Sequence, residues 1–303
     1  MQIEETQRIA EALGREVLAT ATLAGGFSHE TCLLTLADGR VVARLGGPDP
    51  AIEAAVMAAA REHVPVPEVL LVLPATADTR PAMVLEYVPG TPLSEVLAGA
   101  GQELGELGVE VGRVAARIGA VAFDRPGFFA DHHLTLPAEG WGPQLAEFAA
   151  TCMAAVPEPR LDRATREAWT AMCTTHAPAL ARIEKQARLV HADMNPKNIL
   201  VTRATAGWRV DAVLDWEFSY SGCPYGDAAN MARFGADYPD AFLAGFSAGF
   251  AEHHPADLPL PADWAYLGRV LDMFALSDLT TRPLGHPVAD QAAALIRRLV
   301  TAG

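Results

Sequence analysis

LVHADMNPKNILV (residues 189–201) and AVLDWEFSYSGCPYGDAANMARF (residues 212–234) are the two segments that decide the fold of this chain. In both, polar residues stand at the end of short apolar runs. Asp193 and Asn198 lie in a loop between two such runs, and Asp215 follows a third. Apolar runs of this length are typical of short buried strands, which would hold the loop on a rigid support. The pattern predicts a β-ribbon that carries a cluster of oxygen-bearing side chains.

These three side chains offer oxygen atoms that could bind a divalent cation and a carboxylate that could take part in acid–base chemistry. Asn198 and Asp215 offer the hard oxygen ligands that Mg²⁺ prefers. Asp193 offers a carboxylate that can accept or orient the proton of a hydroxyl group. The alternative, in which these residues only form turns and end a strand, must explain three spacings at once.

The motifs resemble those of the aminoglycoside phosphotransferase family, which has a protein-kinase-like fold. The stretch from His191 to Asn198 resembles the family's catalytic loop, HxDxxxxN. Asp215, seventeen residues later, resembles its second metal-binding segment, and Asp227, twelve residues further, matches the acidic residue that supports the loop. The resemblance covers about residues 20–280. It implies that Asp193 is catalytic, that Asn198 and Asp215 bind the metal, and that His191 and Asp227 are structural.

The catalytic-loop motif departs from the family pattern at two positions. Ala192 stands between the histidine and the aspartate, where glycine is usual. Asn195 stands where protein kinases carry a loop lysine and many relatives carry histidine. Lys197 lies two residues further on, where it could reach the transferred phosphate or be a solvated surface charge, and the sequence leaves both roles open.

The first 90 residues resemble the nucleotide-binding lobe of the family. Gly25, Gly26 and Ser28 precede a strand, as in the family's short glycine loop, where backbone N–H groups and a hydroxyl approach the β-phosphate. Arg44 occupies the strand position at which kinases carry a lysine, and Glu53 on the following helix resembles its ion-pair partner.

Arginine must supply any phosphate-binding cation in this part of the chain. The only lysines of the sequence are Lys185 and Lys197. An arginine is permanently charged and binds in a bidentate manner, so it can do the electrostatic work of the lysine with a different geometry. An ordinary surface position for Arg44 and Glu53 is the competing interpretation.

The segment LEYVPG resembles the kinase hinge. The carbonyl of Glu86 and the N–H of Val88 would hydrogen-bond the purine of a nucleotide. The resemblance therefore divides the chain into a nucleotide-binding lobe at 1–87, a hinge at 88–92, and a catalytic and acceptor-binding lobe at 93–303. Because these contacts are made by the main chain, they do not decide between ATP and GTP.

Hydrophobic periodicity favours an α+β chain with two lobes: a small antiparallel sheet with one inserted helix, then a larger, mainly helical part. An Asp-Gly pair at 38–39 predicts a hairpin. Strands are expected at 32–36, 41–45, 69–73 and 82–87, and helices at 3–13, 51–60, 93–122, 143–156, 162–185, 227–252, 262–279 and 287–302.

Composition excludes several classes of protein. The 303 residues contain 37 acidic and 23 basic side chains, a formal net charge of −14, which argues against binding nucleic acid. The four cysteines are far apart, so neither a disulfide framework nor a zinc site is expected. The polar N-terminus does not resemble a signal peptide, and no uncharged apolar stretch reaches the ~20 residues of a membrane span. We therefore expect a cytoplasmic protein with no membrane partner, either a monomer or a homodimer.

The acceptor-binding residues are not marked by a motif. Carboxylates and imidazoles in the helical part could surround a polyamine sugar, but each could equally be a helix cap or a solvated side chain. The candidates are Asp131, His132, Asp237, Asp240 and Asp272.

Three functions remain open. The first is transfer of the γ-phosphate of ATP or GTP, with Mg²⁺, to a hydroxyl of an antibiotic of the aminoglycoside, peptide, macrolide or nucleoside type, giving resistance. The second is a metabolic kinase of the same fold, acting on choline, homoserine or a sugar. The third, a nucleotide-binding scaffold without activity, is disfavoured because Asp193, Asn198 and Asp215 are all present. A protein kinase is disfavoured because too few residues separate Asp215 from Asp227 for an activation loop.

Overall fold

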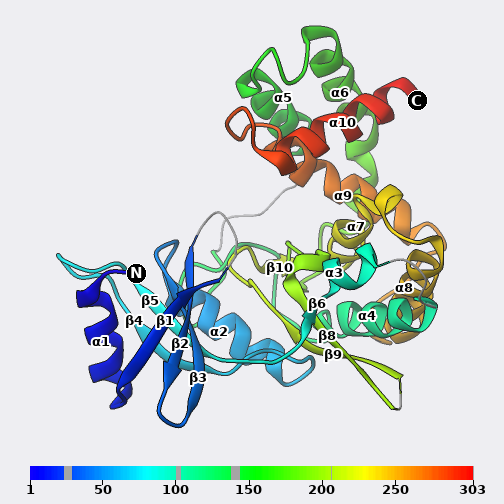
Figure 1. Cartoon of the computed structure of the whole chain (residues 1–303). Helices are drawn as coiled ribbons and strands as arrows, with labels where there is room; N and C mark the ends of the chain where they lie inside the picture. Colours follow the sequence, from blue (N-terminus) through cyan, green and yellow to red (C-terminus); the bar gives the residue numbers. More distant parts are fainter. Residues whose placement is uncertain (24–28, 100–103, 138–143, 206, 303) are drawn as a thin grey trace.

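A five-stranded antiparallel sheet forms the smaller, N-terminal lobe of the computed structural model (Figure 1). The structure describes residues 1–23, 29–99, 104–137, 144–205 and 207–302. The strand order is β1-β2-β3-β5-β4. The elements of this lobe are α1 (Ile3–Leu13), β1 (Val17–Thr22), β2 (Glu30–Leu36), β3 (Gly39–Leu45), α2 (Pro50–Arg61), β4 (Val69–Leu73) and β5 (Ala82–Glu86).

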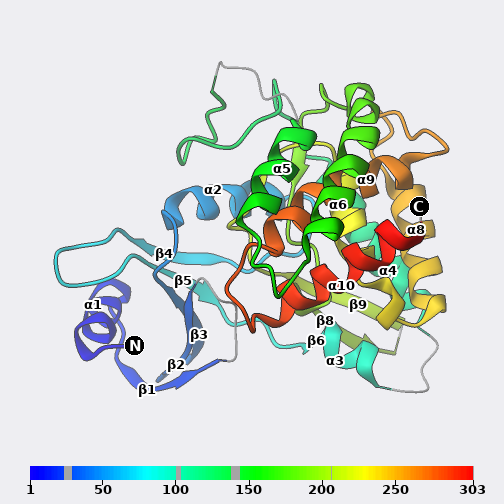
Figure 2. The same ribbon diagram turned by 90° about the horizontal axis from the view of Figure 1, so that it is seen from above.

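The two faces of this sheet are covered by different helices (Figure 2). Ile9 of α1 packs with Val41, Ala43 and Leu45, which are alternate residues of β3. Side chains alternate between the faces of a strand, so Arg44 must point to the opposite face, where α2 lies. The alternation of side chains along β3 thus directs Arg44 toward α2.

The larger lobe is mainly helical and is threaded by two small antiparallel sheets, β6-β8-β9 and β10-β7. Its elements are β6 (Thr91–Pro92), α3 (Leu93–Ala98), α4 (Gly105–Ile118), α5 (Leu145–Ala155), α6 (Arg163–His176), η1 (Ala177–Arg182), β7 (Arg188–Val190), η2 (Pro196–Asn198), β8 (Ile199–Ala204), β9 (Gly207–Val213), β10 (Tyr220–Gly222), α7 (Tyr225–Ala232), η3 (Gly235–Asp237), α8 (Asp240–His253), α9 (Trp264–Leu279) and α10 (Pro287–Ala302).

The α+β fold class and the two-lobed arrangement are confirmed, and so are most expected elements. Two expected helices are broken. The helix expected at 93–122 is two helices, because the backbone of Gly99 is extended after α3. The helix expected at 227–252 is also two, since Pro239 is extended and starts α8 afresh. The strands β1, β6 and β10 were not expected at all.

One hydrophobic core runs through both lobes. It joins Val56 and Met57 of α2 and Met83 of β5 to the helices of the larger lobe, including Phe246 of α8. None of the described helices is long and apolar enough to cross a membrane. The catalytic-loop segment lies between β7 and β8, where this shared core holds both of its ends.

Candidate active site

One buried carboxylate holds the loop that follows β7. Asp227, on the first turn of α7, accepts hydrogen bonds from the backbone N–H groups of His191 and Ala192, both at 2.9 Å. Its side chain is fully buried, and burial raises its pKa to about 7. The support that the sequence assigned to Asp227 therefore consists of two backbone contacts to the start of the loop.

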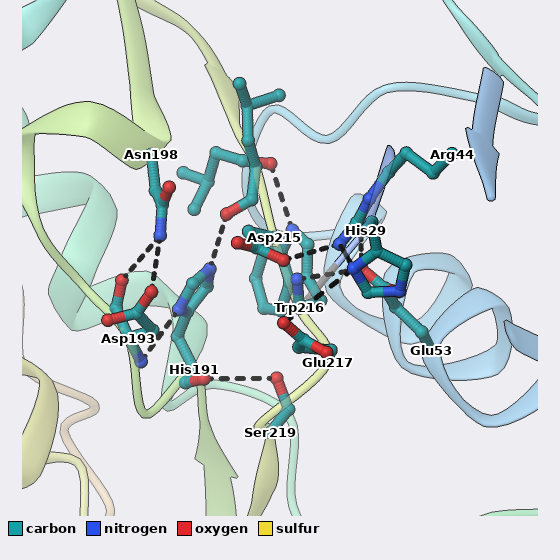
Figure 3. A network of polar contacts seen from close by, with 12 residues as sticks. His29, Arg44, Glu53, His191, Asp193, Asn198, Asp215, Trp216, Glu217 and Ser219 are labelled. Atoms are coloured by element: carbon teal, nitrogen blue, oxygen red, sulfur yellow. Dashed lines mark hydrogen bonds and ion pairs between the residues drawn. The ribbon is translucent and has the colours of Figure 1, made fainter. Parts of the chain in front are cut away.

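His191 ties the same loop to the strand that leads into Asp215. Its Nδ1 accepts the N–H of Asp193 at 3.2 Å, and its Nε2 lies 2.9 Å from the carbonyl oxygen of Leu214 (Figure 3). These partners require a neutral ring with the proton on Nε2. Burial lowers the pKa of His191 to about 4, which is consistent with that neutral form. The histidine is placed to hold the backbone.

Asp193 and Asn198 face one another across the loop. The Asn198 Nδ2 donates to Oδ2 of Asp193 at 2.8 Å and to its backbone oxygen at 3.0 Å (Figure 3). Burial, and then the nearby charge of Asp215, raise the pKa of Asp193 to about 6. Asn195 and Asn198 oppose this shift through hydrogen bonds. The carboxylate is thus held in one orientation and tuned toward the range in which a base works best.

Arg44 connects the smaller lobe to this site. Its NH1 pairs with Glu53 of α2, and its NH2 lies 2.6 Å from Oδ1 of Asp215 (Figure 3). Glu53 also accepts the backbone N–H of Trp216 at 3.0 Å. Burial raises the pKa of Glu53, an effect that the Arg44 charge opposes. The expected Arg44–Glu53 pair is therefore present and continues to the segment that carries Asp215.

His29 was not among the candidates, yet it lies at the centre of these contacts. Its Nδ1 is 3.0 Å from NH2 of Arg44 and 3.8 Å from a carboxylate oxygen of Glu217. Burial, and then the charge of Arg44, lower the pKa of His29 to about 4. A side chain at Gly47, where φ is 77°, would overlap the imidazole. The only signal in the sequence was the position of His29 beside the glycine loop.

Two residues of the site have left-handed backbone conformations. The φ angle is 68° at both Ala192 and Asp215. Such conformations cost non-glycine residues about 1–3 kcal/mol and persist where the surroundings fix them. Here Asp227 fixes the first residue, and Arg44 holds the side chain of the second. The two strained residues are Ala192, which directly precedes Asp193, and Asp215, a proposed metal ligand.

The donor set fits a magnesium ion. The Asn198 amide nitrogen faces Asp193, so its oxygen is left for another partner. Arg44 occupies only Oδ1 of Asp215, and no residue in the described ranges donates to Oδ2. An amide oxygen and a carboxylate oxygen on neighbouring segments are ligands of the type Mg²⁺ takes beside nucleotide phosphates. His29, Asp215 and Glu217 form a second possible group, with ligand atoms within 4.8 Å of one another.

A model of the phosphotransferase enzyme family matches residues 20–264. The chain belongs to this family. No curated protein sequence matches it. Among solved structures, aminoglycoside phosphotransferase APH(4)-Ia matches with a TM-score of 0.72 and 17% identity, over 98% of this chain and 97% of that one. The GDP and kanamycin complex of APH(2'')-IIIa matches with a TM-score of 0.70 and 16% identity, over 99% of each chain.

Both comparisons confirm the sequence-based interpretation at the level of family and fold. The family match covers the catalytic loop, the segment after Asp215, and Arg44. The structural match extends the kinase-like fold over nearly the whole chain. The phosphotransferase activity follows from family membership, while the roles of individual residues stay predictions.

Only some of the segments expected to bind the nucleotide lie within the residues that the structure describes. Gly25, Gly26 and Ser28 lie outside the described residues. In the segment expected to contact the purine, the N–H of Glu86 donates to the carbonyl oxygen of Glu68 at 2.8 Å, so the expected contact from Glu86 is its carbonyl. Within the described ranges, no group accepts a hydrogen bond from the N–H of Val88, as a purine-binding amide requires.

The acceptor candidates are placed in different environments. Asp131 accepts the N–H groups of two nearby residues and shapes its own turn. The His132 ring is 4.0 Å from that of His133. Asp237 and Asp240 are exposed at η3 and at the start of α8. Across the described ranges, none of these four side chains hydrogen-bonds to Asp193.

Asp272 is the buried member of that set. Its carboxylate accepts hydrogen bonds from Nε of Arg233, shared between the two oxygens at 3.0 Å, from NH2 of Arg233 at 2.6 Å, and from Nδ2 of Asn230 at 2.8 Å. The charge of Arg233 lowers the pKa of Asp193, against the effect of burial. Arg233, which was not a candidate, therefore acts on the site electrostatically, and Asp272 holds it in place.

Proposed function

We propose that this phosphotransferase moves the γ-phosphoryl group of ATP or GTP to a hydroxyl of a small molecule, and that the small molecule is an antibiotic of the aminoglycoside type. The observation that carries the proposal is the convergence of three segments: Asn198 bonds to Asp193, and Arg44 of the other lobe bonds to Asp215. These contacts support the proposal, because phosphoryl transfer needs a base, metal ligands and a phosphate-binding cation close together.

Each residue has a definite task in this reaction. The Asp193 carboxylate takes the proton of the acceptor hydroxyl while the oxygen of that hydroxyl bonds to the γ-phosphorus. At the same time the bond between the γ-phosphorus and the β–γ bridging oxygen breaks. Asn198 and Asp215 would hold Mg²⁺, which neutralises charge on the phosphates. Arg44 would pair with the α- and β-phosphates, and Glu53 keeps it aimed. The product is a phosphate ester and a nucleoside diphosphate.

The proposed division of labour follows the lobes. Residues 1–87 would bind the nucleotide, residues 88–92 would form the hinge that contacts the purine, and residues 93–303 would carry the catalytic loop and the acceptor site. In support, Thr91 and Pro92 pair with β8 directly after the catalytic loop, so the hinge is tied to the larger lobe.

The antibiotic class rests on two supports. The matched structures contain hygromycin B in APH(4)-Ia and kanamycin in APH(2'')-IIIa. The chain itself has a net charge of −14, which complements a polycationic acceptor. Both supports favour an amino sugar over a neutral or anionic metabolite.

The test has a cellular and a chemical part. The chain is expressed in a sensitive bacterium, and inhibitory concentrations are measured for kanamycin, hygromycin B and members of other antibiotic classes, beside the variant Asp193→Asn. Protection that the variant abolishes supports the proposal.

In vitro, Mg²⁺-dependent formation of nucleoside diphosphate should fall by at least about 1,000-fold in Asp193→Asn, with nucleotide affinity retained. Robust turnover on choline, homoserine or a sugar without protection would assign a metabolic kinase instead.

A further inference from the structure

The imidazole of His29 is almost completely covered and lies beside the guanidinium of Arg44 (Figure 3). Its side chain is 8% exposed, and Nδ1 lies 3.0 Å from NH2 of Arg44. A guanidinium nitrogen can only donate, so Nδ1 accepts and the ring proton is on Nε2. A carboxylate oxygen of Glu217 lies 3.8 Å from the same Nδ1, which is too far for a hydrogen bond. His29 is therefore a neutral hydrogen-bond acceptor for Arg44.

Two acceptors share NH2 of Arg44. Besides contacting Nδ1 of His29, this nitrogen donates to Oδ1 of Asp215 at 2.6 Å. It carries two hydrogens, so both bonds can be present together. The acceptors differ in charge, because Asp215 is a carboxylate and the imidazole is neutral. The bond to His29 therefore orients the guanidinium without neutralising its positive charge.

The bond between Arg44 and Asp215 is the one that metal binding would weaken. Asp215 carries one negative charge, and a cation at one of its oxygens lowers the attraction of the other oxygen for a second cation. Glu53 holds the opposite side of the guanidinium through NH1. With a metal ion at Asp215, His29 is the remaining acceptor for NH2 within the described part of the chain.

The backbone at Gly47 leaves room for the imidazole. A Cβ at Gly47 would lie 2.2 Å from Nε2 of His29, and the φ angle of this glycine is 77°. A larger residue at this position would displace the ring, and Nδ1 with it. The place of His29 is therefore set by its packing as well as by its bond to Arg44.

We propose that His29 is a positioning residue for Arg44: it keeps the guanidinium directed at the nucleotide phosphates while Asp215 serves the metal ion. His29 acts through Arg44 and contacts neither the phosphates nor the metal. The inference rests on the proposed function, because it requires that magnesium and nucleotide phosphates bind beside Arg44 and Asp215.

The test is calorimetric titration of the whole chain with ADP at several concentrations of Mg²⁺. His29→Leu removes the acceptor, so the affinity for ADP with Mg²⁺ should fall about tenfold, and half-maximal binding should need more Mg²⁺. His29→Asn places an amide oxygen where Nδ1 was, and should restore the affinity to within about threefold of wild type. Adenosine, which has no phosphate, should bind equally to all three proteins. Wild-type affinity for ADP in His29→Leu would overturn the proposal.

A double-mutant cycle separates positioning from a structural role. In the Arg44→Met background, His29→Leu should change the affinity for ADP by less than about twofold, because a residue that acts through Arg44 then has nothing to position. If the loss in that background equals the loss in the native background, His29 binds the metal or supports the fold itself, and the proposal is wrong.

The matched control is His63→Leu. This histidine belongs to the same lobe, follows α2, and makes no hydrogen bond to Arg44 in the described residues, so its loss should leave the affinity for ADP unchanged. Thermal unfolding checks the fold of every variant. A wild-type chain that binds no ADP at any Mg²⁺ concentration would refute the proposed function together with this inference, whereas a failed cycle in a chain that binds ADP refutes this inference alone.

Discussion

The environment of Asp193 sets the pH at which the proposed base can work. Its pKa is raised to about 6 by burial and by Asp215. The base must be ionised to take a proton, so activity is expected to be full above pH 7 and to fall about tenfold per pH unit below 6. The measurement is kcat/KM against pH, which reports ionisations of the free enzyme and substrate. A flat profile down to pH 4 would contradict the assignment of Asp193.

Asp227 offers a second test at the scale of single residues. Asp227→Asn replaces one acceptor oxygen by an NH₂ group that faces a backbone N–H of His191 or Ala192. A buried donor left without a partner costs about 2 kcal/mol. We expect a lower melting temperature and at least about 100-fold slower turnover, because the loop that carries Asp193 moves. Nucleotide affinity is the control, since Arg44 and the hinge are untouched.

Arg44 should not be replaceable by lysine. Its two terminal nitrogens contact Glu53, His29 and Asp215 together, and one ammonium cannot make all of these contacts. The affinity for magnesium-nucleotide should fall in the order wild type, Arg44→Lys, Arg44→Met, with about tenfold between the first two. Calorimetric titration with ADP and Mg²⁺ measures it. Equal affinities for wild type and Arg44→Met would show that Arg44 binds no phosphate.

At this scale the sequence could name as candidates the residues whose signal is local. Asp193, Asn198 and Asp215 stand in short motifs with fixed spacing, so a reading of the sequence alone selects them. His29 and Arg233 could not be found in this way. The contacts of His29 depend on the space that Gly47 leaves, and those of Arg233 depend on Asp272, which lies 39 residues away.

At the scale of elements, α4 and α8 pack with their backbones in close approach. A Cβ at Gly108 would overlap the carbonyl oxygen of Phe242, and a Cβ at Gly249 would overlap that of Val109. Gly108→Ala is expected to destabilise the fold by about 3 kcal/mol, because neither backbone can yield without separating the helices. Chemical denaturation measures the loss.

The control for this prediction lies on the same helix. At Gly105 the nearest atom to an added Cβ is 3.7 Å away, an ordinary contact. Gly105→Ala should therefore leave stability unchanged or raise it slightly, since alanine favours the helix more than glycine does. Equal losses in the two variants would show that helix propensity, and not the close approach, determines the effect.

Elements were predicted well where one face of a helix or strand is apolar throughout. α1, α2 and the hairpin of β2 and β3 follow such patterns. The breaks at Gly99 and Pro239 were missed because the apolar residues continue across them. β10 was missed because it has only three residues and is defined by its pairing with β7.

At the scale of the whole molecule, Arg160 fastens the outer helices together. Its buried guanidinium donates to the carbonyl oxygens of Thr280 at 2.9 Å and Pro283 at 2.6 Å, and pairs with Asp290 of α10 at 3.1 Å. Arg160→Met should destabilise the protein by about 3 kcal/mol, because the buried carbonyl of Thr280 loses its donor and the bonds to Pro283 and Asp290 are lost as well. Hydrogen exchange should speed up first in α10. Arg163→Met, an exposed neighbour, should change stability by less than about 0.5 kcal/mol.

The order of α5, α6, α9 and α10 in space could not be derived from the sequence. The apolar face of each helix shows that the helix is buried, but it does not specify which other helix packs against it. Polar contacts between distant residues also join these helices, such as the bond from Trp169 Nε1 of α6 to the Ser277 hydroxyl of α9 at 2.9 Å. Contacts of this kind leave no periodic signal, so the lobes could be predicted and the arrangement within the larger one could not.

The use of arginine at position 44 has a practical consequence for chemical labelling. Many reagents that report on nucleotide sites deliver an electrophile to a lysine amine beside the phosphates. Before Lys185 this chain has no lysine, so such a reagent finds no side-chain amine in the smaller lobe. A vicinal dicarbonyl, which condenses with guanidinium groups, would be the suitable warhead, and bound nucleotide should shield Arg44 from it.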